Sequence, residues 1–432
     1  MKEYMNMFQI NDFSKSINIA DSNVKKQAPG LRISFLWGML WFWLGARMAL
    51  PLLMRENLYL SSVFTTIINV SLSALIIFLL LTQVKRNSLK SHMFFFVLLF
   101  YLITIIATII SPALNGSNIL RVVGLLTSSF TICIACFLCV KRMPPIMALQ
   151  VMLRSLITGI LLTTLLLIAL NPSVTEIQNL GARFGDTDVL HPNTLGFIYA
   201  ICLLGLLFLN IYPTVWRYFL ALLFGVLLLL TLSKTSIIAA LLATMVGWLV
   251  SRGANKLKST FLYALLFIPI IIIFGDLVFE RLEIYFLSPQ ALTLSGRIPL
   301  WEYVFQIVQE RPLIGYGFGV FRYIVPASIL GWNITDIAHA HNTVMDILFS
   351  SGYLGLISFI ILLTYTTGLL IHGVLGSKKL PLIMPVLFVL LMSQSITNAS
   401  LNLGIDFIVM TVIGLVSENI LTNKHRPQSS MP

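Results

Sequence analysis

The residues best suited to proton transfer lie in one short segment, Asp336-Ile-Ala-His339-Ala-His341-Asn342. An imidazole, whose ordinary pKa is about 6.5, can take a proton from a hydroxyl group at neutral pH, and a nearby carboxylate can orient it. His339 and His341 are two residues apart, so in an extended segment their side chains point to the same side. The two histidines and Asp336 could instead bind a metal ion, or the pair could be structural.

Cations form a second group of residues that could do chemistry. Arg183 lies shortly before His191-Pro-Asn-Thr-Leu-Gly, Lys234 lies in Leu-Ser-Lys-Thr-Ser, and Arg297 follows Ser295-Gly296. Arginine binds phosphate oxygens in a bidentate manner, and lysine acts as a point charge. Together with Arg311 and Arg322, these residues would suit a lipid-linked phosphate or pyrophosphate, with anionic lipid headgroups as the alternative ligand.

The elements that must position these side chains are membrane spans. The 432 residues are 58% hydrophobic and 10% charged, against about 45–50% and about 25% in ordinary soluble proteins, so a cytosolic enzyme is excluded. The mean hydropathy of +0.93 agrees. Twelve apolar runs have the length of a spanning helix, at residues 33–53, 59–82, 93–111, 118–140, 148–171, 193–211, 215–232, 235–251, 260–279, 343–371, 380–397 and 401–421. We expect an all-α, polytopic integral membrane protein.

The distribution of basic residues predicts the orientation of these spans. With the N-terminus inside, 19 of the 28 Lys and Arg residues fall in cytoplasmic segments, as the positive-inside rule requires. Residues 1–32 and 423–432 would then be cytoplasmic tails of a membrane domain at 33–422, and the two long loops at 172–192 and 280–342 would face outward. Arg47, Arg55 and Arg121 flank spans, where a snorkelling side chain accounts for them. The net charge of +12 therefore favours membrane lipids, and not nucleic acid, as partners.

The longer outward loop has helical spacing of its own. Its apolar residues Leu300, Trp301, Val304, Phe305, Ile307 and Val308 recur at the period of an α-helix, after Pro299. We expect a short amphipathic helix on the outer leaflet.

At these residues the chain resembles the O-antigen ligase and polymerase family, whose members join lipid-linked glycans at the outer face of the bacterial inner membrane. The family signature of His-Asn, nine residues and Gly-x-x-Gly is matched by His341-Asn342 and Gly352-Tyr353-Leu354-Gly355. Ser295-Gly296-Arg297, Trp301 and the run Arg311-Pro-Leu-Ile-Gly-Tyr316-Gly look like the large periplasmic loop of that family. That run, His191-Pro-Asn-Thr-Leu-Gly and Ser233-Lys234-Thr235-Ser236 are more similar to the polymerases than to the ligases.

The resemblance implies a metal-independent, inverting glycosyl transfer with no cofactor. The donor would be a glycan on undecaprenyl pyrophosphate, the acceptor a hydroxyl of a second lipid-linked repeat unit, and a chain-length regulator a further partner. It implies His341 as the general base, with Arg297, Arg183 and Lys234 on the pyrophosphate. Supporting or substrate-binding roles would fall to His339, Asn342, Asp336, Trp301 and Tyr316.

Two other functions fit the same sequence. Ligation of the glycan to lipid A core would use the same His-Asn signature. A transporter or flippase of lipid-linked saccharides would also have about twelve spans, but transporters usually bind substrate near the bilayer midplane on broken helices. The polar residues of this chain collect instead at the outer ends of spans, which favours an enzyme.

Overall fold

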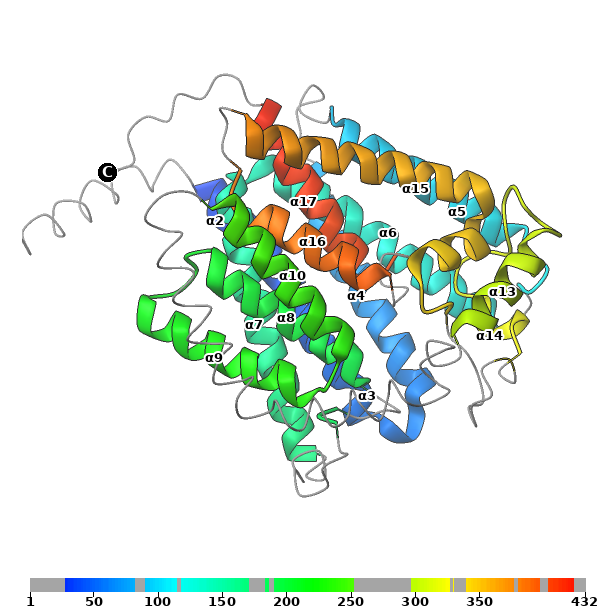
Figure 1. The fold of residues 1–432 in the computed structure, drawn as a ribbon, viewed down its shortest axis with the longest axis horizontal. Helices are drawn as coiled ribbons and strands as arrows, with labels where there is room; N and C mark the ends of the chain where they lie inside the picture. The colour runs from blue at the N-terminus through cyan, green and yellow to red at the C-terminus, as the bar shows by residue number, and fades with distance from the viewer. Residues whose placement is uncertain are drawn as a thin grey trace, which may run out of the picture.

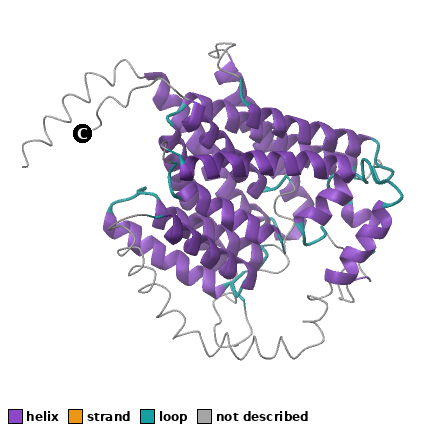
Figure 2. Cartoon of the chain, turned by 45° about the horizontal axis from the view of Figure 1, so that its top comes forward, coloured by secondary structure: helices purple, strands orange, loops and turns teal. Residues whose placement is uncertain are grey.

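The structure, a computed structural model, describes residues 28–81, 90–114, 118–170, 183–185, 190–251, 297–326, 329, 339–376, 380–396 and 403–422. These residues form an all-α bundle without β-strands (Figures 1 and 2). Its long elements are α2 (Ala28–Ala46), α4 (Leu58–Leu81), α5 (His92–Ile109), α6 (Ile119–Arg142), α7 (Pro145–Leu170), α8 (Pro192–Phe208), α9 (Thr214–Leu230), α10 (Lys234–Val250), α15 (Thr343–Leu375), α16 (Ile383–Ser395) and α17 (Ile405–Thr422). Eleven of the twelve predicted spans correspond to these helices, and the span predicted at 260–279 lies outside the described residues.

Length and composition allow seven segments of the described chain to cross a membrane as helices of 18 residues or more. The apolar helices α8, α9, α10 and α16 are shorter, at 13 to 17 residues. Many large apolar side chains face outward, including Phe35 and Phe78, each 67% exposed. An outer surface of this kind suits lipid, because soluble proteins rarely expose large apolar patches. The chain is therefore a multi-pass membrane protein.

The first predicted span is not one continuous helix. After α2 the chain makes a short 3-10 turn, η2 (Arg47–Ala49), then α3 (Leu50–Leu53) and a second 3-10 turn, η3 (Arg55–Asn57). Pro51 lacks an amide hydrogen and interrupts regular helical hydrogen bonding here. This break places Arg47 between α2 and α4 instead of at the end of a straight span.

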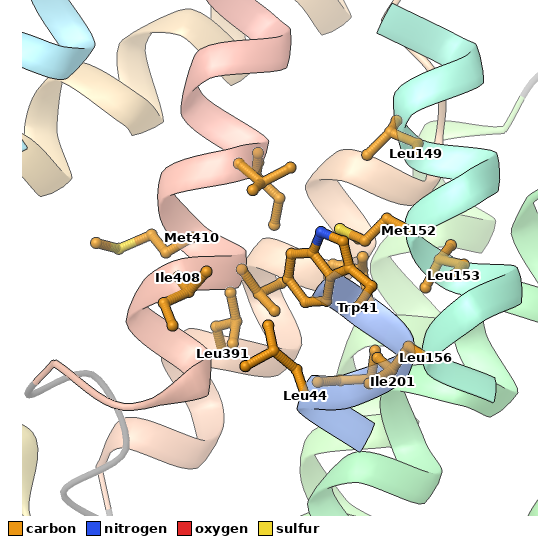
Figure 3. Close-up of a cluster of buried hydrophobic side chains, with 14 of the residues drawn as sticks. Trp41, Leu44, Leu149, Met152, Leu153, Leu156, Ile201, Leu391, Ile408 and Met410 are labelled. Carbon is orange, nitrogen blue, oxygen red and sulfur yellow. The ribbon is translucent and has the colours of Figure 1, made fainter. Parts of the chain in front are cut away.

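The core forms where small residues let helices approach. A Cβ atom added to Gly159 of α7 would lie 2.3 Å from the carbonyl oxygen of Phe42 in α2, so only glycine fits at this crossing. Around it, Trp41 and Leu44 of α2 pack against residues of α7, α8, α16 and α17 (Figure 3). This packing joins the first helices of the chain to the last two.

Hydrogen bonds show which helix ends lie together. At one end, Arg311 donates to the carbonyl oxygen of Ile110, after α5, and Asn342, before α15, donates to that of Ile396, after α16. We call this the site end. At the opposite end the Glu418 carboxylate of α17 accepts from the backbone N–H groups of His92 and Met93, at 2.8 and 3.3 Å, and from Ser91. A carboxylate at a helix N-terminus is favourable, and Glu418 thereby ties α17 to α5.

A second, smaller apolar cluster lies at the site end. Helix α13 (Arg297–Val308) buries Leu300, Val304 and Val308 along one face, as the helical spacing predicted. These residues pack with Phe321 of α14 (Phe321–Ile324) and Phe349 of α15 in a second apolar cluster. The predicted helix therefore exists, and the structure shows it packed on the start of α15.

Helix α15 is broken at Gly352, whose φ of 60° and ψ of −163° are not helical. The run at 311–317 fills the break with its own backbone: the N–H groups of Tyr316 and Gly317 donate to the carbonyl oxygens of Phe349 and Ser350 at 2.8 and 2.9 Å. In return, the N–H groups of Tyr353 and Leu354 donate to the carbonyl oxygens of Pro312 and Leu313, at 2.7 and 3.1 Å. A broken helix at membrane depth requires such replacement partners, because lipid offers none.

Candidate active site

The two histidines predicted as chemical groups lie together just before α15. The ring centroids of His339 and His341 are 4.4 Å apart, with an angle of 49° between the planes. His341 has a positive φ of 53°, which is uncommon for a residue with a Cβ atom and turns the chain sharply into the helix. Strained backbone of this kind persists only where surrounding contacts hold it.

Those contacts are made to the peptide groups of Ala340, between the two histidines. Its N–H donates to the Asp346 carboxylate in the first turn of α15, at 3.1 Å. Its carbonyl oxygen accepts from the indole Nε1–H of Trp301 on α13, at 2.8 Å. Ala340 is fully buried, so both peptide groups depend on these side chains for partners. The His339–His341 segment is therefore clamped between α13 and α15.

Neighbouring charges and burial keep His341 neutral. Burial in the protein is the largest influence, followed by the charges of His339, Arg297 and His191, and together they lower the pKa of His341 to about 2. The imidazole is thus unprotonated at neutral pH and is able to accept a proton. Arg297 is the first residue of α13, and it is the arginine whose charge lowers the pKa of His341.

Arg183 belongs to the same site end, held by two helices. Its Nε donates to the carbonyl oxygen of Thr231, after α9, at 3.0 Å, and its Nη2 donates to Oδ1 of Asn193 in α8, at 2.5 Å. Burial lowers the pKa of Arg183. Guanidinium groups remain charged in proteins despite such shifts, so Arg183 supplies a fixed positive charge.

His191 connects Arg183 to the histidine pair. Burial, then the charge of Arg183, then that of His339 lower the pKa of His191. Its Nδ1 accepts from the backbone N–H of Asn193 at 3.1 Å, capping α8, so in the neutral ring the proton is on Nε2 and can be donated to a ligand. We had not predicted His191 as a site residue, although its position beside Arg183 at the start of a span was a signal for it.

Lys234 opens α10 next to this group of residues. The neighbouring hairpin packs closely on α8, since a Cβ atom added to Gly196 would lie 2.8 Å from Oγ1 of Thr231. Ser236 then donates to the carbonyl oxygen of Asn193 at 3.4 Å. Lys234 is exposed at the site end, three residues after Thr231, whose carbonyl oxygen accepts from Arg183.

Three other predicted residues take part in packing or lie elsewhere. The Tyr316 hydroxyl lies 2.8 Å from Oε2 of Glu310 and 3.0 Å from the carbonyl oxygen of Ile307, and its ring stacks on Phe349. Burial raises the pKa of Tyr316 to about 12, so this hydroxyl stays protonated. Asn342 caps α15 by accepting from the N–H of Met345 at 3.1 Å. Asp336 lies outside the described residues.

The site end thus brings together the imidazoles of His339 and His341, a third imidazole at the start of α8, and the cations Arg297 and Arg183. An imidazole beside fixed positive charges can take a proton from a hydroxyl while the cations bind an anionic leaving group. Comparison with known families gives one finding: a family model described as O-antigen ligase matches residues 219–360. No curated protein matches the chain. The matched segment contains Lys234, Arg297 and His341, whereas Arg183 and His191 precede it.

Proposed function

We propose that the chain polymerises undecaprenyl-pyrophosphate-linked oligosaccharide repeat units at the periplasmic face of the inner membrane, a proposal supported by the match of residues 219–360 to a family model described as O-antigen ligase. The reaction is a metal-independent, inverting glycosyl transfer. The observation that supports it most is a neutral, clamped His341 under the electrostatic influence of Arg297.

In the proposed reaction, His341 removes the proton from the acceptor hydroxyl as its oxygen attacks the anomeric carbon of the donor. The new glycosidic C–O bond forms while the bond from that carbon to the pyrophosphate oxygen breaks. The electron pair leaves with the pyrophosphate, and Arg297, Arg183 and Lys234 stabilise its negative charge. His191 is positioned to donate a hydrogen bond to the same anion.

Donor binding also strengthens the base in this scheme. Without an anion, the positive neighbours of His341 oppose its protonation. A bound pyrophosphate would offset those charges and raise the pKa of His341, because an opposite charge nearby favours the charged form. The base would therefore gain proton affinity only when the donor is present.

Ligation of the glycan to lipid A core is a second candidate function, because the matching family model carries the description O-antigen ligase. Deletion of the gene followed by gel analysis of surface glycan separates the two. Loss of polymerisation leaves a single repeat unit attached to the surface. Loss of ligation leaves long polymer on the carrier lipid and none on the core, and would refute the polymerase assignment.

The absence of a metal requirement is tested with purified protein and lipid-linked donor, with and without EDTA. We expect equal turnover in both. Loss of turnover in EDTA that is restored by a divalent cation would contradict the metal-independent mechanism.

A further inference from the structure

A cavity of about 470 Å³ lies away from the histidines, between η2, α4, α6 and the start of α17. Its volume is within the range of roughly 300–1,000 Å³ that is usual for small-molecule sites. None of its lining residues belongs to the group around His341. All of them except Phe318 also lie outside the segment that the family model matches.

The wall of this cavity is unusually polar for a membrane helix. Hydroxyl and amide side chains line it from one face of α4 and from the facing side of α6, namely Ser61, Ser62, Thr65, Thr66, Asn69, Ser128 and Ser129. Two of them are already paired, since Nδ2 of Asn69 donates to Oγ of Ser128 at 2.8 Å. Nearer the site end, the wall still has hydrogen-bonding capacity for a ligand.

Two groups carry that capacity. Ser61 is 1% exposed, and its hydroxyl has no hydrogen-bond partner among the residues that the structure describes. Arg47 lines the same cavity with a partly exposed side chain, and within the described chain its guanidinium makes no hydrogen bond or ion pair. A charged group in a transmembrane bundle is costly without a partner, so it marks a binding site.

Part of the cavity lining is apolar and exposed. Its lining includes Leu58 and Leu125, which are 44% and 38% exposed on the outer surface of the bundle. Leu58 and Leu125 lie in the first two turns of α4 and α6, which begin at the site end. Arg47 follows α2, which ends at the site end. A lipid could therefore enter from the bilayer with its headgroup at the level of Arg47.

We propose that this cavity binds the phosphoglycerol headgroup of an anionic phospholipid. The phosphate pairs with Arg47, and the glycerol hydroxyls exchange hydrogen bonds with Ser61 and the neighbouring hydroxyls of α4. A cation held between transmembrane helices suits an anionic lipid headgroup. Snorkelling of Arg47 to the membrane surface would account for its charge but not for the hydroxyl-lined wall around it. The proposed lipid site does not depend on the proposed glycosyl transfer.

Native mass spectrometry of the detergent-solubilised full-length protein tests the charge. Dioleoyl phosphatidylglycerol should bind at least about ten-fold more tightly than dioleoyl phosphatidylcholine, because the choline cation offsets the phosphate charge that Arg47 would bind and supplies no hydroxyl groups. Arg47→Gln should remove the preference, and Arg47→Lys should keep part of it. Arg55→Gln is the matched control, since Arg55 is exposed nearby and does not line the cavity.

The hydroxyl wall is tested with dioleoyl phosphatidic acid, which has the phosphate but lacks the headgroup glycerol of phosphatidylglycerol. It should bind less tightly than phosphatidylglycerol, and Ser61→Ala should reduce phosphatidylglycerol binding several-fold, even if Arg47→Gln does not fold. Equal binding of phosphatidylcholine, or an equal loss in Arg55→Gln, would overturn the proposal. Displacement of phosphatidylglycerol by an equal concentration of undecaprenyl phosphate would show that the carrier lipid is the occupant, and would overturn it too.

Discussion

At the scale of the residue, His341 is defined by its surroundings more than by its type. The peptide groups before it are held by Trp301 and Asp346, its φ is positive, and its pKa is lowered to about 2. His339 has its ring 4.4 Å away and takes part in the same electrostatics. The two histidines therefore share a pocket but differ in position, and substitution separates their roles.

We predict that His341→Ala loses nearly all polymer, because a positioned base contributes about 10² to 10⁴-fold. His339→Ala should lose less, since it keeps the base and removes only a neighbour. The measurement is polymer formed by purified variants from lipid-linked donor, with donor binding as the control for folding. Wild-type turnover in His341→Ala would eliminate it as the base.

The pH dependence follows from the lowered pKa of His341. In the free protein the imidazole stays unprotonated as pH falls through about 6.5, so kcat/KM should not decline there on account of His341. With donor bound, the pyrophosphate raises the pKa of His341, so kcat should decline at a higher pH than kcat/KM does. Residual turnover of His341→Ala shows how much of either decline comes from protonation of the donor. Coinciding declines of the two parameters would contradict the proposed coupling.

Arg297 is expected to bind the pyrophosphate. The positive charge should contribute more to this binding than the bidentate geometry of the guanidinium group does. We predict that Arg297→Ala loses about ten-fold to a hundred-fold or more in turnover, corresponding to about 1.5 to 3 kcal/mol for a charge-assisted hydrogen bond. Arg297→Lys should retain some turnover. Product yield at matched protein levels is the measurement, and an Arg297→Ala variant as active as the wild type would remove Arg297 from the site.

At the scale of the element, the break in α15 explains two motifs at once. Gly352 and Gly315 both have positive φ, of 60° and 64°, and the backbones on either side exchange four hydrogen bonds. A Cβ atom on Gly352 would lie 2.4 Å from the carbonyl carbon of Leu313, and one on Gly315 would lie 2.3 Å from the carbonyl oxygen of Phe349. The glycines of the His-Asn signature and of the run at 311–317 thus form one backbone junction, which holds α13 and the start of α15 together.

We predict that Gly352→Ala is strongly destabilising. A residue with a Cβ atom at the φ and ψ of Gly352 costs about 1–3 kcal/mol, and the clash with Leu313 adds to it. Gly368→Ala, in the same helix, is the matched control, because an added Cβ there meets nothing within 4 Å. It should be neutral or stabilising by about 0.5–1 kcal/mol. Thermal unfolding in detergent compares the two, and equal melting temperatures would argue against the junction.

At the scale of the whole molecule, the described helices run between two ends. The groups around His341 and Arg183 lie at one end, and the Glu418 carboxylate, with the Lys141 ammonium 3.9 Å away, lies at the other. The segments predicted to be cytoplasmic from their basic residues, those near Lys90, Lys141 and Arg217, are at the Glu418 end or at the matching ends of α8 and α9. The site end should therefore face the periplasm.

Cysteine labelling in cells tests this orientation. The four native cysteines are buried and free, so they can be replaced to give a cysteine-free background. We predict that a single Ser328→Cys substitution reacts with a membrane-impermeant maleimide once the outer membrane is open. Labelling that requires permeabilisation of the inner membrane would place the site end in the cytoplasm.

The sequence by itself determined the fold class, the positions of the helices and the segment that holds His341. Lipid offers no hydrogen-bond partners to the backbone, so an apolar run of spanning length has to be helical, and eleven predicted spans are helices in the described chain. The periodicity at 300–308 likewise predicted α13, because a helix that buries one face has apolar residues at helical spacing in its sequence.

Only the tertiary structure decided which of the polar residues meet. His191 joins the site because α8 packs against the α9–α10 hairpin at Gly196, a contact with no local signature. Trp301 holds the His339–His341 segment through a hydrogen bond to the backbone of Ala340, the ring of Tyr316 stacks on Phe349 of α15, and Arg47 lines a cavity built by segments far apart in the sequence. Such roles depend on distances between helices remote in sequence, whereas hydropathy and spacing record only how each segment meets lipid or its own neighbours.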